Sequence, residues 1–150
     1  MENTAAAQAV TTARFGEHFA RPLYAHYSFA QLPALLRTLF SDGTAPVAQE
    51  LLGPLAGAYE HVILVLVDAF GWRFVEQYAD SYPFLRRFFS DGVVTRTTAQ
   101  FPSTTAAHLT TLHSGQEVGQ HGVYEWFMYE PTLDTVIAPL LYSYAGDDER

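Results

Sequence analysis

Cysteine is absent from this chain of 150 residues, which excludes disulfide bonds and thiolate metal sites. Charged residues are also scarce, at 16%, and only 8 of them are basic against 16 acidic. The formal net charge of −8 gives no electrostatic footprint for nucleic acid, although bound metal ions can still attract phosphate groups to an acidic protein. These absences exclude disulfide scaffolds and basic nucleic-acid binders.

Targeting and membrane signals are missing as well. The N-terminus lacks a basic region followed by an apolar core, as a secretion signal requires. The apolar run Val62–Val67 is far shorter than the roughly 20 residues that cross a bilayer. Together with the lack of cysteine, this predicts a cytoplasmic protein that makes no use of a membrane.

Hydrophobic residues make up 49% of the chain, enough for one globular domain with a core. Residues 1–22 are rich in Ala and Thr and are predicted to form a loose, partly helical N-terminal arm. Residues 23–150 alternate strand and helix patterns, with no internal repeat or low-complexity tract, so we predict an α/β fold with a parallel sheet.

The expected elements follow from apolar spacing and turn residues. Helices are predicted over Ser28–Phe40, Pro46–Leu52, Gly71–Tyr78, Phe84–Phe89 and Thr104–His113. Strands are predicted over His61–Val67, Val93–Ala99, Val123–Tyr129 and Leu133–Ile137, and a loop over Gly119–Gly122.

Asp68 follows the apolar strand His61–Val67 directly. Ligands of open α/β sheets bind outside the carboxyl ends of the strands, so this carboxylate is expected to face a ligand crevice and bind a metal ion. The alternative is that Asp68 only caps the helix that follows.

Three hydroxyls, Ser103, Thr104 and Thr105, stand where a second predicted strand gives way to a helix. One interpretation is a structural N-cap cluster. The other is a nucleophile, because a helix N-terminus offers N–H groups to a phosphate and a hydroxyl on a divalent cation can ionise. The six histidines show no metal-binding spacing and are interpreted as structural, and the aromatic residues 124–129 as core or interface, or as a pocket wall.

Three motifs then occur in a fixed order. Ile63–Gly71 reads ILVLVDAFG, Phe101–Thr105 reads FPSTT and Leu112–Val123 reads LHSGQEVGQHGV. This order resembles the alkaline phosphatase superfamily and, within it, the type I phosphodiesterase/nucleotide pyrophosphatase family. The resemblance implies an α/β/α sandwich with a mostly parallel sheet, and a hydrolase that uses two zinc ions on a small-molecule phosphate ester.

The resemblance also implies roles for single residues. Asp68 is matched to a metal ligand, and Thr105 to the nucleophile, which also touches the metal. The backbone N–H of Ala106 is matched to a contact with a phosphoryl oxygen. Trp126 stands where many nucleotide pyrophosphatases have a phosphate-binding Asn. The resemblance therefore implies that Trp126 is a fourth site residue, which contacts the substrate. His121 is matched to a structural member of its loop.

Two catalytic zinc ions need roughly three protein ligands each, and only Asp68 and Thr105 are identified here. We therefore expect the chain to be the N-terminal part of a longer enzyme, inactive alone and completed by a C-terminal portion or an oligomer partner. Other possibilities are a non-catalytic binding or assembly module, a phosphomonoesterase, a phosphonate hydrolase or a phosphomutase. A sulfatase is also considered, but residues 103–107 lack the Pro and Arg of a sulfatase motif.

Overall fold

The computed structural model describes residues 1–147, so the last three residues of the predicted 23–150 unit lie outside the described residues. The described part is mixed α/β, with seven α-helices and one three-stranded antiparallel sheet. The helices are α1 (Thr4–Thr12), α2 (Leu32–Leu39), α3 (Pro46–Leu52), α4 (Trp72–Tyr78), α5 (Pro83–Asp91), α6 (Thr105–Ser114) and α7 (Val118–His121). The strands are β1 (Met128–Glu130), β2 (Thr135–Ala138) and β3 (Ser143–Tyr144), and short 3₁₀ helices cover Phe29–Gln31, Gly53–Leu55 and Pro139–Leu141.

Helices α2 and α3 form where the sequence predicts them, and they carry the core. Ser28 accepts a hydrogen bond from the N–H of Ala30 (3.3 Å) and so begins the helical stretch that continues into α2. Proline at the first position starts α3, and Gly53, with φ of +52°, ends it. The buried core cluster joins the two helices and consists of Leu35, Leu39, Ala48 and Leu51.

Residues 1–147 do not show the predicted parallel sheet, because their one sheet is antiparallel with the order β1-β2-β3. Residues 93–99 do not form a strand, because single parallel bridges to Glu2 and Ser28 take the place of a continuous neighbour. Residues 61–67 belong to no helix and no strand. A parallel sheet is stable only with several strands covered on both faces, so two such segments cannot form one here.

The apolar segment 61–67 is consequently exposed. Ile63, Val65 and Val67 are 90%, 75% and 62% exposed, whereas Val62 packs against the core cluster. The total accessible surface is 10250 Å², compared with about 7,600 Å² for a compact monomer of this mass. The described chain thus leaves uncovered the strand that the sequence suggests should be buried.

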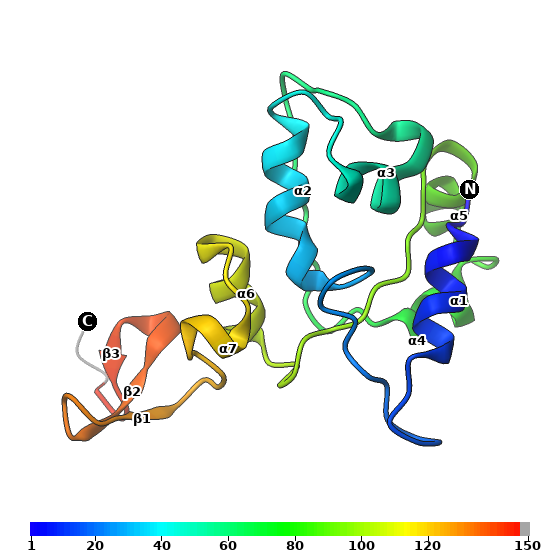
Figure 1. Ribbon diagram of the computed structural model, residues 1–150. Coiled ribbons are helices and arrows are strands. Elements are labelled where there is room, and N and C mark those ends of the chain that lie inside the picture. The colour runs from blue at the N-terminus through cyan, green and yellow to red at the C-terminus, as the bar shows by residue number, and fades with distance from the viewer. Residues whose placement is uncertain (148–150) are drawn as a thin grey trace.

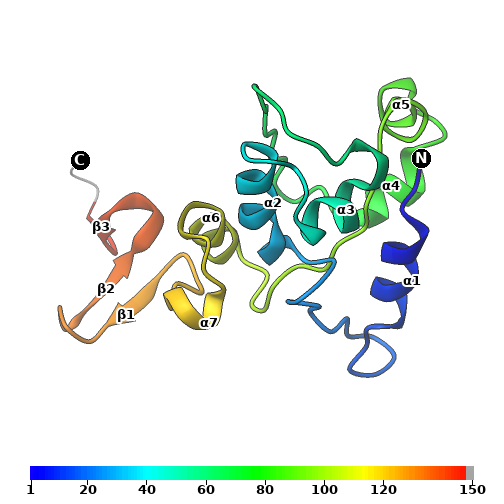
Figure 2. The ribbon, with the colours of Figure 1, turned by 45° about the horizontal axis from the view of Figure 1, so that its top comes forward.

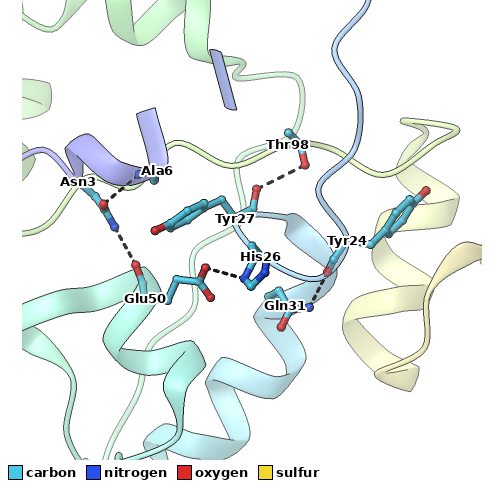
Figure 3. A network of polar contacts seen from close by, with 8 residues as sticks. All are labelled: Asn3, Ala6, Tyr24, His26, Tyr27, Gln31, Glu50 and Thr98. Carbon is cyan, nitrogen blue, oxygen red and sulfur yellow. Dashed lines mark hydrogen bonds and ion pairs between the residues drawn. The ribbon is translucent and has the colours of Figure 1, made fainter. Parts of the chain in front are cut away.

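The predicted N-terminal arm contains α1 and is tied to the body by polar contacts (Figure 3). Asn3 caps α1 by accepting a hydrogen bond from the N–H of Ala6 (3.1 Å) and donates from its side chain to the backbone carbonyl of Glu50 (2.8 Å). The Glu50 carboxylate lies 2.9 Å from Nδ1 of His26, and the hydroxyl of Thr98 donates to the backbone carbonyl of Tyr27 (3.4 Å). These contacts hold residues 3 and 26 against α3 and hold residue 98 against residue 27.

The C-terminal strands lie at one end of the molecule, with α6 and α7 between them and the remaining helices (Figures 1 and 2). Strand β1 is shorter than the predicted strand over residues 123–129. The predicted loop Gly119–Gly122 is wrong in part, because residues 118–121 form α7, which the Gln120 side chain stabilises by accepting the N–H of Glu117 (3.0 Å). Within residues 1–147, no helix combines the length and apolar character needed to traverse a bilayer.

Candidate active site

Asp68 and Thr105 come together although 37 residues separate them in sequence. The hydroxyl of Thr105 donates to Oδ2 of Asp68 across 3.1 Å, and Oδ1 of Asp68 accepts the N–H of Ala69 at 2.8 Å. Ala69 has φ of +58°, so the chain turns sharply at the end of the apolar segment and enters α4. This turn directs one carboxylate oxygen toward the start of α6.

The neighbouring hydroxyl of Thr104 makes structural hydrogen bonds and does not contact Asp68. It accepts the N–H of Ala107 (3.3 Å) as the N-cap of α6 and donates to the carbonyl of Tyr124 (2.8 Å). Both hydrogen-bonding functions of this hydroxyl are therefore used in structure. Among Ser103, Thr104 and Thr105, the third is the one whose hydroxyl faces the Asp68 carboxylate.

Ala106 and Trp126, the other two predicted site residues, lie in different surroundings. Ala106 is completely buried at the second position of α6, where backbone N–H groups have no acceptor within the helix. Trp126 is 40% exposed in the segment before β1 and is not among the residues lining the cavity beside Asp68 and Thr105. The structure thus brings Asp68 and Thr105 together, whereas neither Ala106 nor Trp126 lines the cavity beside them.

A cavity of about 500 Å³ opens beside the Asp68–Thr105 pair. Apolar side chains of Leu66 and Val75 line it, together with Trp72 and Arg96. The Arg96 guanidinium lies 5.2 Å from the centre of the Trp72 ring and 3.6 Å from the Glu76 carboxylate. A cationic group and an aromatic ring therefore share the cavity with the hydroxyl, a composition suited to an anionic organic ligand.

The Asp68–Thr105 pair is compatible with part of a zinc site. Zn–O bonds of about 2.0 Å place two ligand oxygens of a tetrahedral site about 3.3 Å apart, close to the observed 3.1 Å. Within residues 1–147, however, no three His, Cys, Asp or Glu side chains gather closely enough to hold a metal ion. These two residues can supply two oxygen ligands, and any further ligands must come from elsewhere.

The loop before α6 is held by residues that sequence reasoning did not select. His108 hydrogen-bonds to both the N–H of Gln100 and the carbonyl of Thr104, and the Tyr24 hydroxyl accepts the N–H of Phe101 (3.1 Å). The spacing of His108 from Thr104, one helical turn, is the sequence signal that could have indicated the first of these contacts.

His121 lies at the C-terminal end of α7 and faces α6. Its Nδ1 accepts the N–H of Val123 (3.0 Å), and its Nε2 lies 3.0 Å from the hydroxyl of Thr111, a fully buried residue. Burial lowers the pKa of the His121 imidazole below its ordinary value of 6.5, and a hydrogen bond with the backbone of Ala107 partly opposes this. His121 joins two helices and does not face the Asp68–Thr105 pair.

A family model for type I phosphodiesterase / nucleotide pyrophosphatase matches residues 62–139, slightly more than half of the chain. The chain belongs to this family. The matched segment contains the apolar residues 62–67, Asp68, the hydroxyl loop, α6 and α7. No curated protein and no solved structure matches the chain.

Membership confirms the family indicated by the three sequence motifs, and it points to phosphoester hydrolysis as the activity. Enzymes of the type I phosphodiesterase/nucleotide pyrophosphatase family are typically metal-dependent. The two oxygen donors brought together at Asp68 and Thr105 lie inside the matched segment.

Proposed function

We propose that this chain carries the nucleophile of a metal-dependent hydrolase of phosphodiester or phosphoanhydride bonds, and that Thr105 is that nucleophile. The contact between the Thr105 hydroxyl and the Asp68 carboxylate supports the proposal most directly. The first free N–H groups of α6, including that of Ala106, provide a place for the phosphoryl oxygens next to this hydroxyl.

The reaction proceeds in two displacements. The Thr105 hydroxyl loses its proton to solvent water, and its oxygen forms a bond to phosphorus while the bond to the leaving oxygen breaks. Water then attacks the phosphothreonine, which releases the phosphate product and restores the hydroxyl. Because Thr104 caps the helix, the segment that presents Thr105 is fixed before the substrate arrives.

Asp68 and Thr105 would hold one of two zinc ions. The ion would lower the pKa of the threonine hydroxyl and stabilise negative charge on the phosphoryl group. Since these two residues cannot complete even one site, the proposal includes further protein, either more of the same polypeptide or an oligomer partner, that supplies the other ligands. The exposed segment 63–67 supports this, because it offers an apolar surface for such protein to cover.

The leaving group is expected to be organic. The cavity beside Thr105 contains the ring of Trp72 and the guanidinium of Arg96, next to apolar side chains. Its volume of about 500 Å³ accommodates a small molecule. The substrate is therefore proposed to be a small phosphate ester or anhydride.

Substitution of Thr105 tests the proposal in the complete enzyme, with zinc and a chromogenic aryl phosphodiester as the probe. Thr105→Ala should lower kcat by at least ~10³, the scale observed when a nucleophile is removed and only binding and electrostatics remain. Thr105→Ser should keep part of the activity, because the attacking oxygen is retained.

Ser103→Ala is the matched control and should lower kcat far less than Thr105→Ala does. Thr104→Ala should cost about 1 kcal/mol of stability through the lost cap and, because this cap fixes the segment that presents Thr105, should lower kcat by less than Thr105→Ala does. Near-normal kcat in Thr105→Ala, or trapped phosphate on Ser103 or Thr104, would contradict the assignment.

A further inference from the structure

His108 contacts both ends of the loop that leads to the proposed nucleophile. Its Nε2 lies 3.1 Å from the backbone nitrogen of Gln100, and its Nδ1 lies 2.9 Å from the backbone carbonyl of Thr104. One imidazole thus spans the loop from its first residue to the residue before Thr105. We propose that His108 is a positioning residue that fixes Thr105 by clamping this loop onto the first turn of α6.

The two contacts define one tautomer of the ring. The Gln100 N–H can only donate, so Nε2 must be an unprotonated acceptor. The Thr104 carbonyl can only accept, so Nδ1 must carry the hydrogen. The neutral Nδ1–H imidazole is the form that satisfies both, and either the other tautomer or the imidazolium would lose at least one hydrogen bond.

The ring and the far end of the loop are themselves held in place. Phe29 packs edge-on against the His108 ring, with the ring centres 4.6 Å apart and an interplanar angle of 73°. Gln100 is only 2% exposed, and its side chain donates to Thr111 (2.8 Å) and accepts the N–H of Val118 (3.3 Å). The clamp is therefore anchored to α6 and α7 on one side and to the segment before α2 on the other.

This arrangement bears on catalysis through Thr104. Its carbonyl is bound by His108, and its hydroxyl caps α6 and contacts Tyr124. Thr105 is the next residue, so the placement of its oxygen follows from that of Thr104. A displacement of about 1 Å at a reacting atom can lower the rate by about 10²-fold, so loosening this loop should lower kcat.

Two substitutions separate the two hydrogen bonds of the clamp. His108→Asn places an amide near the Nδ1 position and can keep the donor to Thr104, but it does not reach Gln100. His108→Gln places an amide oxygen near the Nε2 position and can keep the acceptor for Gln100, but it loses the donor. His113→Gln, at an exposed histidine on the same helix, is the matched control.

The inference rests on the proposed role of Thr105, and it is tested in the complete enzyme with the same aryl phosphodiester. His108→Ala should lower kcat by about 10²-fold with KM changed less than about twofold. The Asn and Gln variants should each recover part of that loss, and His113→Gln should match the unaltered enzyme.

A purely structural role predicts a different result. His108→Ala would then melt at a lower temperature but show unaltered kcat per folded molecule. This result would overturn the inference about His108. The proposed function would still stand if Thr105→Ala were inactive in the same assay. If instead Thr105→Ala stays active, the proposed function fails and the positioning role fails with it.

The tautomer gives a readout that does not depend on activity. In the 150-residue chain near pH 7.5, long-range ¹H–¹⁵N correlation spectra should show His108 with a protonated Nδ1 and an unprotonated Nε2. An Nε2–H pattern, or an averaged pattern, at His108 would overturn the clamp.

Discussion

Asp68 uses its two carboxylate oxygens differently. Oδ1 accepts the N–H of Ala69, which stabilises the sharp turn after the apolar segment, while Oδ2 accepts the hydroxyl of Thr105. Ala69 adopts a left-handed backbone conformation, which is uncommon for a residue with a side chain. One residue therefore shapes the turn and also faces the proposed nucleophile.

Asp68→Asn should separate these two uses. The amide oxygen can still accept the N–H of Ala69, but a neutral amide is a weaker ligand than a carboxylate. In the complete enzyme, bound zinc measured by elemental analysis should fall by about one ion per chain, and activity should fall with it. Asp91→Asn, at an exposed ion pair with Arg87, should keep both, and full zinc in Asp68→Asn would reduce Asp68 to a turn residue.

The contacts of individual site residues could be predicted only where the spacing within a sequence motif specified those residues. The spacing from Phe101 and Pro102 pointed to Thr105, and the structure places its hydroxyl on Asp68, although its catalytic role stays a prediction. The contacts of Gln100 and His108 were not predicted, because they depend on where a loop folds back on a helix. Trp126 was selected by resemblance alone, and it lies away from the cavity beside Thr105.

Whole elements were predictable where their stability is local. Helix α3 has the bounds expected from its first proline and the glycine after it, and α6 differs from its expected range by one residue at each end. The two predicted parallel strands failed because strand pairing depends on distant neighbours. Helix α7 was missed because its glycines suggested a loop, whereas the capping contact of Gln120 favours a helical turn.

The contact between α6 and α7 should weaken in acid. The pKa of His121 is lowered by burial in the folded chain, so below about pH 6.5 the unfolded chain binds more protons than the folded one. This contribution to the free energy of unfolding should therefore be complete above pH 6.5 and decrease as the pH falls through the lowered pKa.

Urea unfolding across pH 5–8 would measure this decrease. His121→Asn keeps an acceptor for the N–H of Val123 but removes the titrating group, so its unfolding free energy should vary less with pH. Equal slopes for His121→Asn and the unaltered chain would show that His121 does not titrate differently on folding.

The molecule as a whole exposes about 2,600 Å² more than a compact protein of its mass would. All five residues of the segment 63–67 are exposed, although the sequence pattern predicts a covered strand there. The core cluster is confined to α2, α3 and the residues packed on them. Coverage of this segment is therefore one difference between the structure and the parallel-sheet fold that the sequence predicts.

Threonine substitutions in the segment 63–67 would measure whether other protein covers it. In the isolated chain, Ile63→Thr and Val65→Thr should change the unfolding free energy by less than about 0.5 kcal/mol and reduce binding of an apolar fluorescent dye. In the complete enzyme the same changes should destabilise by about 1–3 kcal/mol, because the side chains would be buried.

Leu39→Thr, in the core cluster, should destabilise both forms and so serves as the control. If Ile63→Thr and Val65→Thr destabilise the isolated chain as strongly as Leu39→Thr does, the segment is already covered there.

The pairing of the first residues with Val94 sets an order of events during synthesis. The N–H of Asn3 donates to the carbonyl of Val94 (2.9 Å), whereas the core of α2 and α3 needs only neighbouring residues. At about 5–20 residues per second, the ribosome takes roughly 5–20 s to reach the partner of a residue made at the start. The α2–α3 unit can therefore fold before Val94, the partner of the N-terminal arm, has been synthesised. During that interval the arm is unpaired and accessible to chaperones and proteases.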